Sequence, residues 1–170
     1  IGAYFLTKHI LNTKYLILNT KIPALLAGIF YTLNIATIQT FYAPLEGFVY
    51  HFAFLPWLLF TSILFLEKSN LTRTIFLVFT LFLATPASYI PTLFVVYILA
   101  ISVYIFVNSI LNSDKIHILT TSAKLFFIII LVNAFWLLPF LYFTVNNSHI
   151  NLNSKINQMG TETIFLQNKE

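Results

Sequence analysis

Long apolar runs alternate with short polar segments along the chain. A helix needs about 20 apolar residues to cross a hydrocarbon core of about 30 Å. Runs that meet or approach this length cover residues 22–41, 48–66, 72–85, 91–111 and 122–145. An apolar run at residues 1–11 resembles the end of a helix whose beginning is absent. The pattern predicts an all-α protein, a polytopic transmembrane helix bundle with about five complete spans plus a truncated N-terminal helix.

The run at residues 72–85 is the shortest of the five. Its roughly 14 residues before Pro86 would give only about 21 Å of helix. A re-entrant arm is therefore an alternative to a full crossing. We favour a crossing, because the run at residues 91–111 is long enough to span, and the basic linkers that flank this pair then lie on one side of the membrane.

Basic residues concentrate in alternate linkers, at residues 8–21, 67–73 and 112–124. These linkers hold Lys8, Lys14, Lys21, Lys68, Arg73, Lys115 and Lys124. Short cytoplasmic loops accumulate Lys and Arg, so we predict that these three face the cytoplasm of a cell membrane. Loop 42–47, turn 86–90 and the chain after Val145 then face outward. We divide the chain into a transmembrane domain, residues 1–145, and a polar outward-facing loop or tail, residues 146–170.

The composition excludes several classes of protein. Hydrophobic residues make up 59% of the chain and charged residues 8%, against about 25% charged in a soluble domain. The 9 Lys and Arg lie singly, without the basic stripe that nucleic-acid binding requires. With no Cys and with scattered His, the sequence predicts neither a metal site nor a cofactor. The expected partners are membrane lipids and other helices of the same full-length protein.

Four polar or aromatic residues near the outward ends form a candidate substrate site. Asn34 lies in the second half of the 22–41 run, and Glu46, Tyr50 and His51 come shortly before and within the next run. A carboxylate can accept a proton or a hydroxyl hydrogen, and aromatic rings can stack on a sugar. We predict that these residues line an outward cavity. Alternatively, Asn34 bonds neighbouring helices as a packing residue and Glu46 is simply solvated.

Prolines within two spans predict local bends. Pro56 removes the backbone hydrogen bond to the Phe52 carbonyl, and Pro139 does the same to Phe135. Two bent helices could open a cavity, although prolines are also tolerated in spans generally. Small residues on one face of the 22–41 run, among them Gly28, predict close approach of a neighbouring helix.

The order of several apolar motifs resembles a known family. The motifs are Tyr4 to Lys8, Ala24 to Asn34, Glu46-Gly47, Phe54-Leu55-Pro56-Trp57, Pro91-Thr92-Leu93-Phe94 and Asn133 to Phe140. Over roughly residues 1–145 the chain is similar to the multi-pass membrane glycosyltransferases of the GT-C class, especially the arabinofuranosyltransferase-like and YfhO-like membrane proteins. Ile35 departs from the pattern, since relatives usually place Pro there.

The resemblance implies sugar transfer from a polyprenyl-phosphate donor on the outer face of the membrane to a glycan, lipid or protein acceptor. It implies a catalytic carboxylate in the first long outward loop, which we expect upstream of Ile1, so we assign no catalytic residue. Two alternatives remain open. A lipid-linked glycan flippase or transporter should carry charged or strongly polar residues through the bilayer centre, whereas a structural subunit would only pack its helices on partners.

Overall fold

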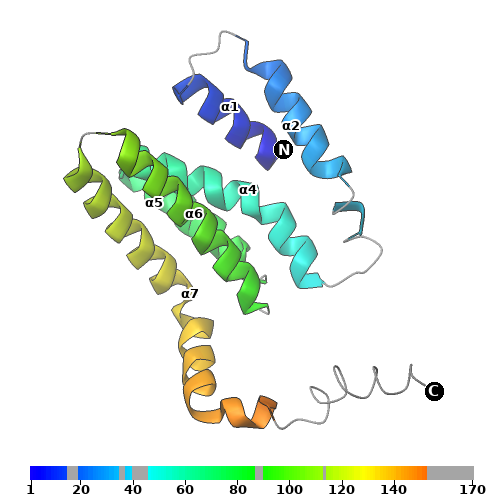
Figure 1. Cartoon of the computed structure of the whole chain (residues 1–170), viewed down its shortest axis with the longest axis vertical. Helices are drawn as coiled ribbons and strands as arrows, with labels where there is room; N and C mark the ends of the chain where they lie inside the picture. Colours follow the sequence, from blue (N-terminus) through cyan, green and yellow to red (C-terminus); the bar gives the residue numbers. More distant parts are fainter. Residues whose placement is uncertain (15–18, 35–36, 40–45, 87–89, 113, 153–170) are drawn as a thin grey trace. The chain divides into compact units, whose positions relative to one another are not determined.

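The computed structural model describes residues 1–14, 19–34, 37–39, 46–86, 90–112 and 114–152. Within these residues the regular structure is helical and contains no strand, which confirms the predicted all-α class. The labelled helices (Figure 1) are α1 Gly2–Lys14, α2 Lys21–Leu33, α4 Glu46–Glu67, α5 Leu71–Leu83, α6 Pro91–Leu111 and α7 Lys115–Leu152.

The chain divides into two compact units, Ile1–Asn133 and Ala134–Glu170, so that α7 belongs partly to each. In the first unit, α1 packs against α2 and α4, while α4 also packs against α5 and α6 (Figure 1). The core of this unit is formed by apolar side chains from α4, α5, α6 and the first part of α7. Its most deeply buried members are Phe65, Leu77, Tyr97, Ile101, Leu125 and Ile129.

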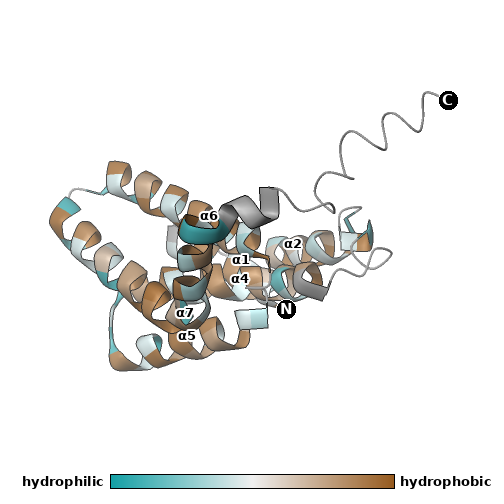
Figure 2. Ribbon diagram, turned by 90° about the horizontal axis from the view of Figure 1, so that it is seen from below, coloured by the Kyte–Doolittle hydropathy of each residue, from teal (hydrophilic) through white to brown (hydrophobic). Residues whose placement is uncertain are grey.

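Among the described residues, four helical segments are long and apolar enough to cross a membrane: Lys21–Gln39, Phe48–Glu67, Pro91–Leu111 and Lys115–Asn147. Figure 2 shows that hydrophobic residues predominate along the helices. Many large apolar side chains stay exposed, as they do in a surface that contacts lipid. The chain is therefore membrane-embedded. Helix α5 is apolar but has 13 residues, or about 20 Å, so the predicted fifth crossing stays a prediction.

All three predicted basic linkers, 8–21, 67–73 and 112–124, are shorter than expected. Helix α1 extends to Lys14, and capping side chains precede the starts of α5 and α7. The linker predicted at residues 112–124 is wrong over most of its length, because α7 begins at Lys115. Asp114 Oδ1 accepts a hydrogen bond from the His117 backbone N–H at 3.1 Å and so satisfies a donor of the first turn. In the same way, Asn70 Oδ1 accepts from the Arg73 N–H at 2.9 Å where α5 begins.

The predicted span at residues 22–41 is not one continuous helix. Helix α2 ends at Leu33, Asn34 is extended with φ −71° and ψ 156°, and residues 37–39 are helical again. At the other end of the chain, α7 continues to Leu152, so the first residues of the predicted polar tail are helical. Asn146 Nδ2 donates to the Tyr142 carbonyl at 2.9 Å, which keeps this amide within the helix. The rest of the tail, residues 42–45 of the predicted loop 42–47 and residues 87–89 of the predicted turn 86–90 lie outside the described residues.

Candidate functional site

Asn34 ends one helix and begins the next helical turn. Its Nδ2 donates to the carbonyls of Phe30 at 3.0 Å and Tyr31 at 2.9 Å in the last turn of α2. The Phe30 carbonyl also accepts from the Asn34 backbone N–H at 3.1 Å. Its Oδ1 accepts from the Thr37 backbone N–H at 3.0 Å. Both hydrogens of the amide are used within the chain. Asn34 therefore acts as a helix cap. Its side chain bonds residues 30, 31 and 37, which are its neighbours in sequence, rather than the neighbouring helix that we predicted as an alternative.

The other three predicted site residues lie at the start of α4. The side chain of Glu46 is outside the described part of the structure, and Tyr50 is half exposed, at 49%. His51 is buried, and its Nε2 has no hydrogen-bond partner among the described residues. By helical periodicity, His51 shares a face with Leu58 of the core and with Leu55, which packs against the core. Binding of a substrate by these residues remains a prediction.

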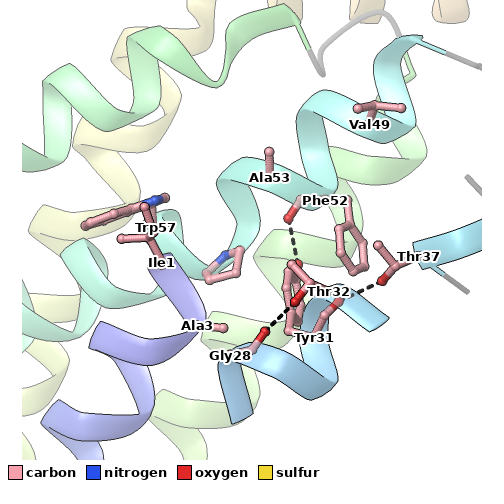
Figure 3. Close-up of a pocket in the computed structure, with 12 residues that line it drawn as sticks. Ile1, Ala3, Gly28, Tyr31, Thr32, Thr37, Val49, Phe52, Ala53 and Trp57 are labelled. Atoms are coloured by element: carbon pink, nitrogen blue, oxygen red, sulfur yellow. Dashed lines mark hydrogen bonds between the residues drawn. The ribbon is translucent and has the colours of Figure 1, made fainter. Parts of the chain in front are cut away.

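A cavity of about 290 Å³ lies where α1, α2 and α4 meet (Figure 3). None of the four predicted residues lines it, although they lie on or next to two of the same helices. Its walls combine small, aliphatic and aromatic side chains with three hydroxyl groups. We call it the Tyr31 cavity, and it is lined by Ile1, Gly2, Ala3, Gly28, Tyr31, Thr32, Thr37, Val49, Phe52, Ala53, Pro56 and Trp57.

Tyr31 compensates for the hydrogen bond that Pro56 removes from α4. Because proline has no N–H, the Phe52 carbonyl lacks its usual partner four residues later. The Tyr31 hydroxyl donates to this carbonyl at 2.6 Å. A dashed line marks this hydrogen bond in Figure 3. The two aromatic rings of Tyr31 and Phe52 also stack, with centroids 4.2 Å apart and an interplanar angle of 16°. Tyr31 of α2 thus supplies the hydrogen bond that the Phe52 carbonyl of α4 lacks because of Pro56.

Gly2 allows α1 to approach α4 closely enough to form one wall of the cavity. A Cβ atom at this position would lie 2.9 Å from two atoms of the Trp57 ring and 3.2 Å from the Pro56 Cβ. These distances are shorter than ordinary van der Waals contacts, so only glycine fits here without a shift of the neighbours. Gly28 differs, because a Cβ there would meet Tyr4 at an ordinary 3.6 Å. The close approach predicted on the small face of α2 is confirmed as packing of α1 against α2.

The hydroxyl groups of the cavity offer acceptors rather than donors. Thr32 Oγ1 donates to the Gly28 carbonyl at 2.8 Å, and Thr37 Oγ1 donates to the Tyr31 carbonyl at 2.7 Å. With the Tyr31 hydrogen also in use, each hydroxyl keeps only lone pairs. The lining contains no Asp, Glu, Lys, Arg or His side chain among the described residues. This chemistry suits a hydrocarbon chain better than a phosphate or a free sugar.

A charged cluster lies at the opposite end of α4. His9 Nε2 lies 2.8 Å from Glu67 Oε1, and Arg73 Nη1 lies 3.6 Å from Glu67 Oε2. Arg73 Nη1 also donates to the Leu64 carbonyl at the end of α4. The cluster connects α1, α4 and α5 at the end that carries the basic linkers. We call it the Glu67 cluster.

Comparisons of the chain with family models, curated proteins and solved structures found no match. The functional interpretation therefore depends on the geometry above and on the motifs in the sequence.

Sequence reasoning missed Tyr31, Gly2 and the Glu67 cluster as structural determinants. For Tyr31 a partial signal exists, since Pro56 predicts an unpartnered Phe52 carbonyl that some donor has to satisfy. The identity of that donor depends on how α2 packs on α4, which no periodicity along one helix contains. Glu67 carries a similar weak signal, because a lone acid within a basic linker is expected to find a cation.

Proposed function

We propose that this chain is part of an integral membrane glycosyltransferase that uses a polyprenyl-phosphate-linked sugar donor on the outer face of the membrane. The Tyr31 cavity would hold the first isoprene units of the donor lipid. The observation that carries this proposal is the cavity itself, an apolar chamber with three aromatic walls in a membrane-embedded chain.

The shape and chemistry of the Tyr31 cavity favour a branched hydrocarbon. An isoprene unit is a branched five-carbon group, so a chamber of about 290 Å³ accommodates a short stretch of the donor's hydrocarbon chain. Val49, Phe52 and Trp57 supply apolar contact surface, and burial of each CH₂ group contributes about 0.8 kcal/mol. The absence of charged side chains from the described lining leaves the phosphate and sugar to groups outside the cavity.

The distribution of charge supports an outward cavity. The cavity lies near the first turns of α4. The basic residues Lys68, Arg73 and Lys115 lie where α4 ends and where α5 and α7 begin. Under the positive-inside rule the basic end faces the cytoplasm. The cavity end then lies in the outer leaflet, where Tyr50 and the predicted Glu46 and His51 could meet the donor headgroup.

The first experiment tests lipid binding and transfer together. The full-length protein in nanodiscs is supplied with a polyprenyl-phosphate sugar, and transfer to acceptor is measured. Ala53→Trp, which fills the Tyr31 cavity, should reduce transfer at least tenfold. Val103→Trp is the matched control, because Val103 is 61% exposed on α6 and lines no described cavity. Equal rates for both variants would contradict the role of the cavity.

A second experiment addresses the predicted headgroup residues. Glu46→Gln and His51→Ala should each slow transfer if these side chains bind donor or acceptor. Transfer at the rate of the unmodified protein by both variants would show that this assignment is wrong. If the protein moves the lipid-linked sugar between leaflets of a vesicle and transfers none of it, the flippase alternative replaces the enzyme.

A further inference from the structure

A second cavity lies at the basic end, between the end of α4, the start of α5 and the first unit's part of α7. It has a volume of about 510 Å³. We call it the Lys124 groove, and its described lining consists of Phe65, Ser69, Thr74, Thr120, Ala123, Lys124, Phe127 and Ile128. On α4 it lies more than two turns beyond the Tyr31 cavity, so the two cavities are separate.

The groove has a cationic rim. The ammonium group of Lys124 is exposed and forms no ion pair with any described residue, and no carboxylate belongs to the lining. Ser69 is also exposed and offers a hydroxyl hydrogen. Lys124 lies near the start of the apolar run 122–145, so its long side chain can carry the charge to the boundary between the hydrocarbon and the aqueous phase.

Two threonines give the groove acceptors beside this cation. Thr74 Oγ1 donates to the Asn70 carbonyl at 2.9 Å, and Thr120 Oγ1 donates to the Ile116 carbonyl at 2.8 Å. Because each hydroxyl hydrogen is already used, their oxygen lone pairs can only accept. A ligand that satisfies the whole rim therefore carries a negative charge for Lys124 and hydroxyl donors for the threonines.

The deeper wall of the groove is apolar. Phe65 and Ile128 form part of it, and Phe127 is 66% exposed beside them. A ligand with a polar anionic head and hydrocarbon tails matches both parts of this surface. Basic pockets between membrane helices commonly bind anionic lipid headgroups.

We propose that the Lys124 groove binds one anionic phospholipid whose headgroup carries free hydroxyls, of the phosphatidylglycerol class. The phosphate pairs with Lys124 and Ser69, the glycerol hydroxyls donate to Thr74 and Thr120, and an acyl chain lies along Phe127. A zwitterionic ethanolamine headgroup fits less well, because its ammonium would lie near that of Lys124. This binding is independent of the proposed sugar transfer.

The test measures lipid affinities of the full-length protein in detergent by native mass spectrometry. Three probes with identical acyl chains are titrated: phosphatidylglycerol, phosphatidylmethanol, which has the charge without the hydroxyls, and zwitterionic phosphatidylcholine. The unmodified protein should bind phosphatidylglycerol at least tenfold more tightly than phosphatidylcholine and about threefold more tightly than phosphatidylmethanol. Equal affinities for phosphatidylglycerol and phosphatidylcholine would overturn the proposal without any variant being needed.

Variants then locate the site. Lys124→Gln should remove most of the preference for anionic lipid, while Lys115→Gln, an equal loss of charge at an exposed position outside the groove, should change it less than twofold. Equal effects of both would indicate general attraction to anionic surfaces and refute a specific groove. Thr74→Val combined with Thr120→Val should equalise phosphatidylglycerol and phosphatidylmethanol. A preference that survives this double change would refute the role of the two acceptors.

Discussion

The hydrogen bond between Tyr31 and the Phe52 carbonyl should contribute to the free energy of unfolding only because residue 56 is proline. In the unmodified chain, Tyr31→Phe removes the donor and leaves this carbonyl without a partner in an apolar environment. Pro56→Ala supplies an N–H at the position that normally bonds this carbonyl in a helix. The two changes therefore form a double-mutant cycle, in which Tyr31→Phe is compared with and without Pro56→Ala.

The magnitude follows from the geometry of this bond. An orphaned buried acceptor costs about 1–3 kcal/mol, and hydrogen bonds between membrane helices contribute about 0.6 kcal/mol on average and up to about 1.7 kcal/mol. At 2.6 Å, and with stacked rings that Phe preserves, we expect Tyr31→Phe to cost about 1.5 kcal/mol. In the Pro56→Ala background the same change should cost about 0.5 kcal/mol or less, which gives a coupling energy of about 1 kcal/mol.

The assay is the free energy of unfolding in mixed micelles, measured by titration with a denaturing detergent and followed by circular dichroism. Tyr142→Phe provides a matched control, because Tyr142 is 68% exposed and its hydroxyl has no described partner. This control should change the unfolding free energy by less than about 0.5 kcal/mol. An equal cost of Tyr31→Phe in both backgrounds would refute the reasoning, since the carbonyl would then not depend on the proline.

Three further changes test other contacts in the same assay. Gly2→Ala should lower the free energy of unfolding by about 1–3 kcal/mol, because its Cβ would overlap the Trp57 ring. Gly28→Ala should leave it unchanged or raise it by up to about 1 kcal/mol. Equal effects of the two substitutions would contradict the close packing of α1. Glu67→Gln should cost about 1 kcal/mol or less, and the loss should shrink in 1 M salt if it comes from the partly exposed ion pairs. Asn34→Ala should cost about 1–2 kcal/mol through three lost capping bonds, and a cost near zero would show that the break after α2 does not need its cap.

The sequence predicted the helices well and their ends poorly, for one physical reason. Long apolar runs identify helices because transfer into lipid depends on summed hydropathy over about 20 residues. Where a helix ends is determined by single hydrogen bonds, such as those of Asp114 before α7 and Asn34 after α2. Both residues look like ordinary polar positions in a hydropathy pattern, so one predicted linker became helix and one predicted span was interrupted.

The site was harder to predict, because it depends on pairs of residues from different helices. Pro56 correctly indicated an unpartnered carbonyl, but Tyr31 became its partner only through the packing of α2 on α4. Similarly, polar residue types drew attention to His51, whereas helical periodicity places it opposite Val49, on the core side of α4. The residue type alone therefore identified candidate chemistry, but not the face on which it lies.

The two ends of the bundle differ in a way that constrains any mechanism. The Tyr31 cavity offers hydrocarbon contact and hydroxyl oxygens that only accept, so it can hold a lipid chain but cannot neutralise a phosphate. The Lys124 groove at the opposite end has an ammonium that forms no ion pair with a described residue, and it suits an anionic headgroup. If the proposed enzyme binds a polyprenyl phosphate through the Tyr31 cavity, the cation that meets the phosphate has to come from outside the cavity lining. Removal of the donor's phosphate should then leave its hydrocarbon contacts in the Tyr31 cavity unchanged, whereas the Lys124 groove should lose its ligand when the phosphate is removed.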